Sequence, residues 1–175
     1  MIVAAYYFFE GFVFMEKEIV KEYLDLLLND FNIYIEVTGK SKISGKQKRI
    51  DAVIIAKEYP NLKFGIEFKR LDLGAFNNFT SWLKQSIIYS QCEFDVFGKL
   101  PILYAPSINY GNKEQQFMFS RIAGEFGLGE ISKEYYKVYN KNIYKIKIKD
   151  TVLWSSHSGF NKAYLKTDFK SHLEL

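Results

Sequence analysis

The sequence predicts one α/β domain in which a mixed central sheet is flanked by helices. Three observations predict this class: a strand hairpin over residues 49–70, an amphipathic helix before it, and a second helix with a buried strand after it. At 175 residues the chain is long enough for one sizeable core and short for two independent domains. We expect a core over residues 15–105, an apolar extension over residues 1–14 and C-terminal additions over residues 106–175.

Composition restricts the metal sites and partners that this chain can have. It is 48% hydrophobic and 18% aromatic, which is typical of a packed globular protein, and its net charge of +4 is compatible with a polyanionic partner. The single cysteine, Cys92, excludes an intrachain disulfide, and with only His157 and His172 no Cys/His zinc site can form. We therefore expect a protein of the reducing cytoplasm, and any metal to be Mg²⁺ or Mn²⁺ held by oxygen ligands.

The first fifteen residues are strongly apolar without the pattern of a targeting segment. They have no basic start, Glu10 interrupts the run, and the stretch is too short to cross a bilayer. We expect neither a signal peptide nor a transmembrane segment, and we predict a buried or edge strand pair here.

An amphipathic helix is predicted from Met15 to Asn29. Its apolar residues recur at helical spacing and are Ile19, Val20, Tyr23, Leu24 and Leu27. Glu16 lies three and four residues before Ile19 and Val20, so it shares the face that packs on the sheet. Glu16 is therefore the acidic residue of this helix that we consider for a site.

A strand over residues 31–37 and a basic polar loop over residues 38–48 are predicted next. The loop is not a nucleotide-binding P-loop, because Gln47 stands where Ser or Thr is required and the glycine spacing is one residue too long. Its basic side chains suit contacts with a nucleic-acid backbone, and a merely solvated loop is an equal alternative. The candidate contacts around the hairpin are Lys46, Lys48, Arg49 and Arg70.

The hairpin over residues 49–70 has two apolar runs on either side of a Pro/Asn turn. In an antiparallel pair centred near Tyr59, opposed residue numbers sum to about 118, so Val53 faces Gly65 and Asp51 faces Glu67, roughly 5 Å apart. Lys69 emerges on the same face as Glu67. The hairpin therefore gathers two carboxylates and an ammonium group at one end.

These three charges have an ordinary explanation and a functional one. Charged residues are common at the ends of strands. However, apolar residues on both faces of this hairpin indicate a sheet interior, where a charge is costly unless it is paired or bound to a metal. We therefore interpret Asp51, Glu67 and Lys69 as a candidate site.

A helix is predicted from residue 78 or 79 to about Cys92, followed by a buried strand from Leu100 to Ala105. Gln85 and Tyr89 lie one helical turn apart, so their polar ends can point to the same place. Taken alone, such a pair is usually a surface feature. A further helix is predicted over residues 113–126.

A second hairpin is predicted from residues 135–139 and 143–149. Lys145, Lys147 and Lys149 alternate with apolar residues in its second arm. We favour the interpretation that they protect an edge strand against aggregation, and a ridge that contacts DNA is the alternative. His157 and His172 have no convincing partners and are predicted to be surface residues.

The order Asp51, Glu67-x-Lys69 and Gln85-x-x-x-Tyr89 resembles the PD-(D/E)xK nuclease superfamily, over roughly residues 15–105. The resemblance implies a restriction-endonuclease-like αβββαβ core within a single nuclease-like domain. It also implies a deoxyribonuclease that hydrolyses phosphodiester bonds in DNA with Mg²⁺ or Mn²⁺. Because the P-loop pattern is not met, we expect no nucleotide cofactor.

The resemblance assigns roles to residues of this chain. Asp51, Glu67 and the carbonyl of Phe68 are the expected metal ligands, and Lys69 is expected to assist the attacking water. The Gln85 and Tyr89 pair is similar to the extra motif of the RecB-like branch, where it positions the nucleic acid.

Two alternatives remain open. The segment from Glu16 to Val20 is similar to the opening helix of archaeal Holliday-junction resolvases, which makes Glu16 a further metal-linked glutamate and suggests a homodimer acting on branched DNA. The second alternative is a non-catalytic nucleic-acid-binding module.

Overall fold

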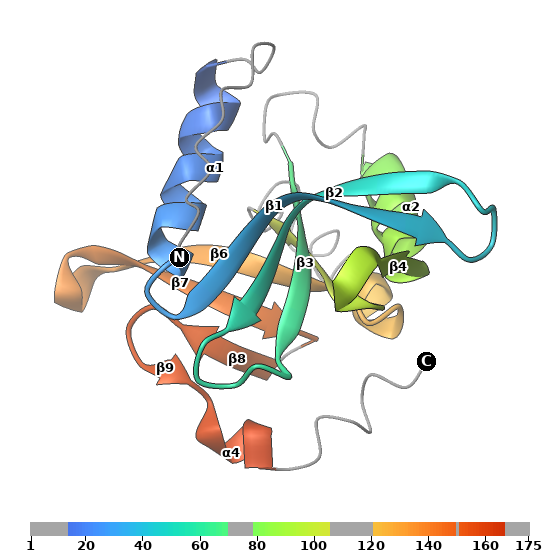
Figure 1. Cartoon of the computed structure of the whole chain (residues 1–175). Helices are drawn as coiled ribbons and strands as arrows, with labels where there is room; N and C mark the ends of the chain where they lie inside the picture. Colours follow the sequence, from blue (N-terminus) through green and yellow to red (C-terminus); the bar gives the residue numbers. More distant parts are fainter. Residues whose placement is uncertain (1–13, 70–78, 106–120, 150, 167–175) are drawn as a thin grey trace, which may run out of the picture.

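The computed structural model describes residues 14–69, 79–105, 121–149 and 151–166 (Figure 1). Within these ranges the fold is mostly β: one nine-stranded mixed sheet, curled into a half-barrel, in the order β4-β1-β2-β3-β5-β6-β7-β8-β9. The strands are β1 Phe31–Ser41, β2 Gln47–Ala56, β3 Lys63–Phe68, β4 Cys92–Phe94, β5 Ile102–Ala105, β6 Gly129–Tyr136, β7 Lys141–Ile148, β8 Thr151–Ser155 and β9 Gly159–Phe160. Two short helices, α1 (Phe14–Leu27) and α2 (Phe79–Ser90), accompany the sheet, and one helical turn, α4 (Lys162–Lys166), follows β9.

The predicted α/β class, a helix-flanked αβββαβ core, is therefore wrong. The strands after Ala105 continue the sheet: β6 pairs with β5 in parallel, and β7 and β8 follow as antiparallel neighbours. A twisted sheet of this many strands curls, so it covers much of its apolar surface by itself rather than with helices. The sequence prediction missed β8, whose five residues are too few to show a period.

The local elements before Ala105 agree better with the sequence. The predicted helix from Met15 corresponds to α1, and the hairpin of β2 and β3 has the predicted register, with Val53 opposite Gly65. Pairing of these two strands ends at Ala52 and Ile66, one step before Asp51 and Glu67.

The first core cluster lies where the curled sheet brings β1 close to β8 and β9. The ring centroid of Phe31 on β1 lies 5.4 Å from that of Trp154 on β8 and 5.5 Å from that of Phe160 on β9. Trp154 Nε1 also donates a hydrogen bond of 2.8 Å to Asp30 Oδ2. Tyr23 and Leu27 of α1 are buried in the same cluster, so α1 packs against this part of the sheet.

A second core cluster positions α2. Tyr89 of α2 is buried with Val53 of β2 and with Ile102 and Tyr104 of β5. Ala52 and Ile54, the neighbours of Val53, belong to the first cluster, so β2 is buried on both faces. This packing holds α2 beside the strands that carry the predicted site (Figure 1).

Strand β7 is not an edge strand, because it lies between β6 and β8. The interpretation of its lysines as protection for an edge is therefore wrong. His157 is exposed, as predicted. No helix in the described ranges is both long and apolar enough to span a membrane.

Some predictions cannot be compared with the structure. The N-terminal strand pair over residues 1–14, Arg70 and His172 lie outside the described residues. Of the helix predicted over residues 113–126, residues 121–125 are helical, and residues 113–120 also lie outside the described ranges.

Candidate active site

Strands β2 and β3 separate at Asp51, and the side chain of Asp51 fills the gap. Phe68 N, which has no strand partner on β2, donates a hydrogen bond of 2.7 Å to Asp51 Oδ2. The alternation of faces also breaks here, since Ile50 and Val53 pack in the same cluster although three positions separate them. Asp51 is thus held at the point where the pairing of β2 with β3 ends.

Glu67 is the centre of the polar network. Its side chain is buried, and the residue is 5% exposed. Glu67 Oε1 accepts hydrogen bonds from Lys69 Nζ at 2.7 Å and from Gln85 Nε2 at 2.6 Å. Lys69 Nζ donates a further bond of 2.7 Å to Gln85 Oε1. The three side chains form a closed triangle between β3 and α2.

The amide of Gln85 links this triangle to Tyr89. Gln85 Nε2 donates its second hydrogen bond, of 2.9 Å, to the hydroxyl of Tyr89 one helical turn later. The Tyr89 ring packs edge-on against Phe94, with the ring centroids 6.4 Å apart. Because both ends of the amide are bonded, its orientation is determined by its partners.

One oxygen of this buried carboxylate lacks a hydrogen-bond partner within the described ranges. Glu67 Oε2 makes no hydrogen bond with any described residue. Burial and the charge of Asp51 raise the pKa of Glu67 to about 7, although Lys69 and Gln85 act in the opposite direction. Burial likewise raises the pKa of Asp51, against the Phe68 N–H and the charge of Lys69. The single positive charge of Lys69 therefore does not fully offset burial and the repulsion between the two carboxylates.

The donor set suits a hard divalent cation. A buried carboxylate, Glu67, beside a half-buried one, Asp51, supplies the oxygen ligands that Mg²⁺ and Mn²⁺ prefer. The described residues contain no group of three or more His, Cys, Asp or Glu side chains that could hold a metal. Further ligands would therefore come from backbone carbonyl groups, such as that of Phe68, and from water.

The other predicted site residues are more scattered. Glu16 lies in α1, and the position of its side chain is outside the described part of the structure. Lys46 is exposed in the turn before β2, and Lys48 is half-buried. Arg49 is exposed and lies 3.6 Å from Glu36 (Arg49 Nη1 to Glu36 Oε1).

Glu36 is a carboxylate that the sequence interpretation missed. The pairs Ile35–Ala52 and Val37–Ile50 place it opposite Asp51, and its charge raises the pKa of Asp51. Its backbone is left-handed, with φ of 54°, a conformation that is uncommon for glutamate. The register between β1 and β2, which the hairpin of β2 and β3 does not determine, brings Glu36 to Asp51.

Tyr104 and Glu130 extend the polar face of the site. Glu67, Tyr104 and Glu130 are register partners on β3, β5 and β6, so their side chains share one face. The hydroxyl of Tyr104 donates a hydrogen bond of 3.2 Å to Glu130 Oε2. No sequence pattern linked these residues to Glu67, because the link depends on parallel pairing between strands distant in sequence.

Comparison of the chain with protein-family models, with curated proteins and with solved structures found no match. The function of this chain is therefore inferred from the geometry of the site and from the motif.

Proposed function

We propose that this protein is a Mg²⁺- or Mn²⁺-dependent nuclease that hydrolyses phosphodiester bonds in DNA. The observation that carries the proposal is the buried, unpartnered Glu67 Oε2, in a residue that Lys69 and Gln85 hold on its other oxygen. A buried carboxylate oxygen without a partner is costly unless a ligand completes it. The motif resemblance supports the same activity, although the curled nine-stranded sheet differs from the αβββαβ core that the resemblance implies.

Asp51, Glu67 and the carbonyl of Phe68 would hold the metal. When bound, a divalent ion supplies Lewis-acid stabilisation of the charged phosphate and lowers the pKa of a bound water. The hydrogen bond from Phe68 N keeps the Asp51 carboxylate beside β3. The chain therefore presents both carboxylates before the substrate arrives, which avoids rearrangement during the reaction.

Lys69 is the residue that would act on the reacting groups. Two of its N–H donors bind Glu67 and Gln85, and no described residue accepts the third. We assign this donor to the attacking water or to a phosphate oxygen on which negative charge develops. Gln85 and Tyr89 hold Lys69 and Glu67 in position, so they are positioning residues.

A cleavage assay with matched variants tests the proposal. Purified full-length protein is incubated with linear, circular, single-stranded and branched DNA in EDTA, Mg²⁺ or Mn²⁺. We expect cleavage with either metal, none in EDTA, and a loss of at least about 100-fold in Asp51→Asn, Glu67→Gln and Lys69→Met. These substitutions preserve side-chain size, and circular dichroism checks the fold.

The control is Glu93→Gln, which neutralises an exposed carboxylate on β4 whose partner is Lys42. It should cleave as the wild type does. Cleavage that persists in all three site variants, or in EDTA, would contradict a metal-dependent nuclease. DNA binding without any product in either metal would instead indicate a non-catalytic binding module.

A further inference from the structure

Three aromatic rings lie against one another at the end of β6 that lies away from Glu130. They belong to Tyr136 at the end of β6, Tyr139 in the turn η3 (Lys137–Tyr139) and His157 after β8. The centroid of Tyr139 lies 6.5 Å from that of Tyr136, with the two rings 28° from parallel. It lies 4.6 Å from that of His157, and these two rings are tilted by 38°. We call these three residues the ring stack.

Tyr139 is exposed, and a hydrogen bond fixes the turn that carries it. Tyr139 is 50% exposed, and its neighbour Val138 is 88% exposed. Asn140, which follows the turn, has a left-handed backbone, and its side-chain oxygen accepts a hydrogen bond of 2.5 Å from the Tyr135 hydroxyl. An exposed aromatic surface on an ordered turn is typical of a recognition site rather than of a solvated loop.

Lysine side chains surround the ring stack. Lys141 Nζ lies 5.9 Å from the ring centroid of Tyr139. Lys145 Nζ lies 4.9 Å from that of Tyr136 and also donates a hydrogen bond to the Tyr136 hydroxyl group. Lys137, in the turn itself, is exposed. These distances are within the range of cation–π attraction, so the rings and the positive charges form one surface.

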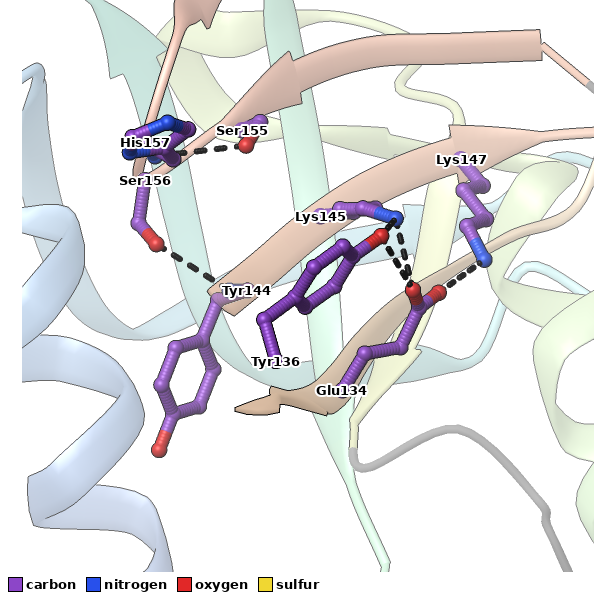
Figure 2. Close-up of polar contacts among 8 residues, drawn as sticks. All are labelled: Glu134, Tyr136, Tyr144, Lys145, Lys147, Ser155, Ser156 and His157. Atoms are coloured by element: carbon purple, nitrogen blue, oxygen red, sulfur yellow. Dashed lines mark hydrogen bonds and ion pairs between the residues drawn. The ribbon is translucent and has the colours of Figure 1, made fainter. Parts of the chain in front are cut away.

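One carboxylate organises this surface without neutralising it. Figure 2 shows Glu134 between Lys145 and Lys147, which donate hydrogen bonds of 2.6 Å and 2.7 Å to its two oxygens. Despite partial burial, these bonds and one from Tyr136 lower the pKa of Glu134 to about 2. Glu134 therefore stays ionised and keeps Lys145 beside the Tyr136 ring.

We propose that the ring stack, with Lys137 and Lys141, binds single-stranded nucleic acid. Unpaired bases stack on exposed aromatic rings, and lysines contact the phosphates that connect the bases. The bases of a duplex are already stacked on one another. A duplex can therefore contact the lysines through its phosphates but cannot stack its bases on the rings. The combination of rings and positive charge thus favours an unpaired strand over a duplex.

The position of the ring stack relates it to the proposed catalytic site. Tyr136 and Glu130 lie on the same face of β6, six residues apart. This spacing separates them by roughly 20 Å along the strand. Glu130 is in turn linked by register to Tyr104 and Glu67. This inference rests on the proposed function. It extends that function by naming single-stranded nucleic acid as the substrate class.

Binding without metal tests the inference separately from cleavage. We would measure fluorescence anisotropy of a labelled single strand of about 15 nucleotides, and of the matching duplex, with full-length protein in EDTA. Tyr139→Ala should weaken single-strand binding about tenfold and leave duplex binding unchanged. A double variant, Lys137→Gln with Lys141→Gln, should weaken binding to both and reduce its dependence on salt.

The matched control is Tyr34→Ala, which removes another exposed tyrosine, 43% exposed, whose ring lies 4.9 Å from that of Phe97. It should bind as the wild type does, and thermal melting checks that both variants fold. Unchanged single-strand binding in Tyr139→Ala, or an equal loss in Tyr34→Ala, would overturn the inference. Cleavage with Mn²⁺ alongside that result would show that the nuclease stands and the binding surface does not. Tyr139-dependent binding without cleavage would show the reverse.

Discussion

Gln85 Nε2 donates a hydrogen bond of 2.6 Å to Glu67 Oε1 from a position 18 residues later in the chain. The bond joins α2 to β3 at the one buried carboxylate oxygen that Lys69 also contacts. It leaves the other oxygen of Glu67 for a ligand. The contacts of Gln85 therefore decide which oxygen of Glu67 can serve the proposed reaction.

Replacing Gln85 should impair cleavage more than stability. In Gln85→Ala, Glu67 and Lys69 lose their shared partner, and we expect activity with Mn²⁺ to fall about 10- to 100-fold, as for other residues that orient metal ligands. The control is Gln91→Ala, which removes an amide just after α2 whose partner is Ser90. Equal activity of the two variants would show that Gln85 does not position the site.

Metal binding should weaken as the pH falls. A proton on Glu67 competes with a cation, and the pKa of this residue is raised to about 7. We expect the affinity for Mn²⁺, measured by calorimetry, to fall about tenfold per pH unit below about pH 7. An affinity that stays constant down to pH 5 would contradict a role for Glu67 as a ligand.

The stability of the metal-free protein should fall as the pH rises. Folding raises the pKa of Glu67 from 4.5 to about 7, so between these values the folded protein binds more protons than the unfolded chain. The free energy of unfolding should therefore decrease across this window, by roughly 3 kcal/mol for this group. Glu67→Gln should lack that part of the decrease, which urea unfolding at pH 4.5 and pH 8 measures in EDTA. A slope equal to that of the wild type would show that Glu67 titrates normally.

The closure of the half-barrel should depend on Trp154. This side chain is 1% exposed, packs on Phe31 and donates a hydrogen bond to Asp30. Trp154→Ala should lower the free energy of unfolding by about 3–5 kcal/mol in urea titrations. Val96→Ala, at a site that is 87% exposed, should change it by less than about 0.5 kcal/mol. A small loss in Trp154→Ala would mean that the two ends of the sheet are not held together there.

The local pattern of the chain predicted two features of the candidate site, the register of the hairpin and the contact between Gln85 and Tyr89. A turn at Tyr59 determines the hairpin register, and one helical turn separates Gln85 from Tyr89, so both follow from short-range periodicity. The break in β2 at Asp51 was not predictable in this way, since it arises where two strands separate.

The prediction of the fold class was wrong because the fold depends on pairing between strands that are far apart in the sequence. Strands β6 and β7 could either extend the central sheet or form a separate addition, depending on which free edge they pair with. The alternation of apolar and polar residues along these strands is the same in both arrangements. The same ambiguity led to the interpretation of β7 as an edge strand. Pairings between segments far apart in the chain leave little trace in either segment alone.

The sequence by itself therefore determined the residue types and the spacing of the site: two carboxylates, a lysine and a Gln-Tyr pair on adjacent elements. Only the tertiary structure decided that Glu67 keeps one oxygen unpartnered among the described residues, that Glu36 faces Asp51, and that the rings of Tyr139 and His157 meet. The physical reason is that periodicity governs which way a side chain points, whereas burial and pairing across the sheet govern what it meets.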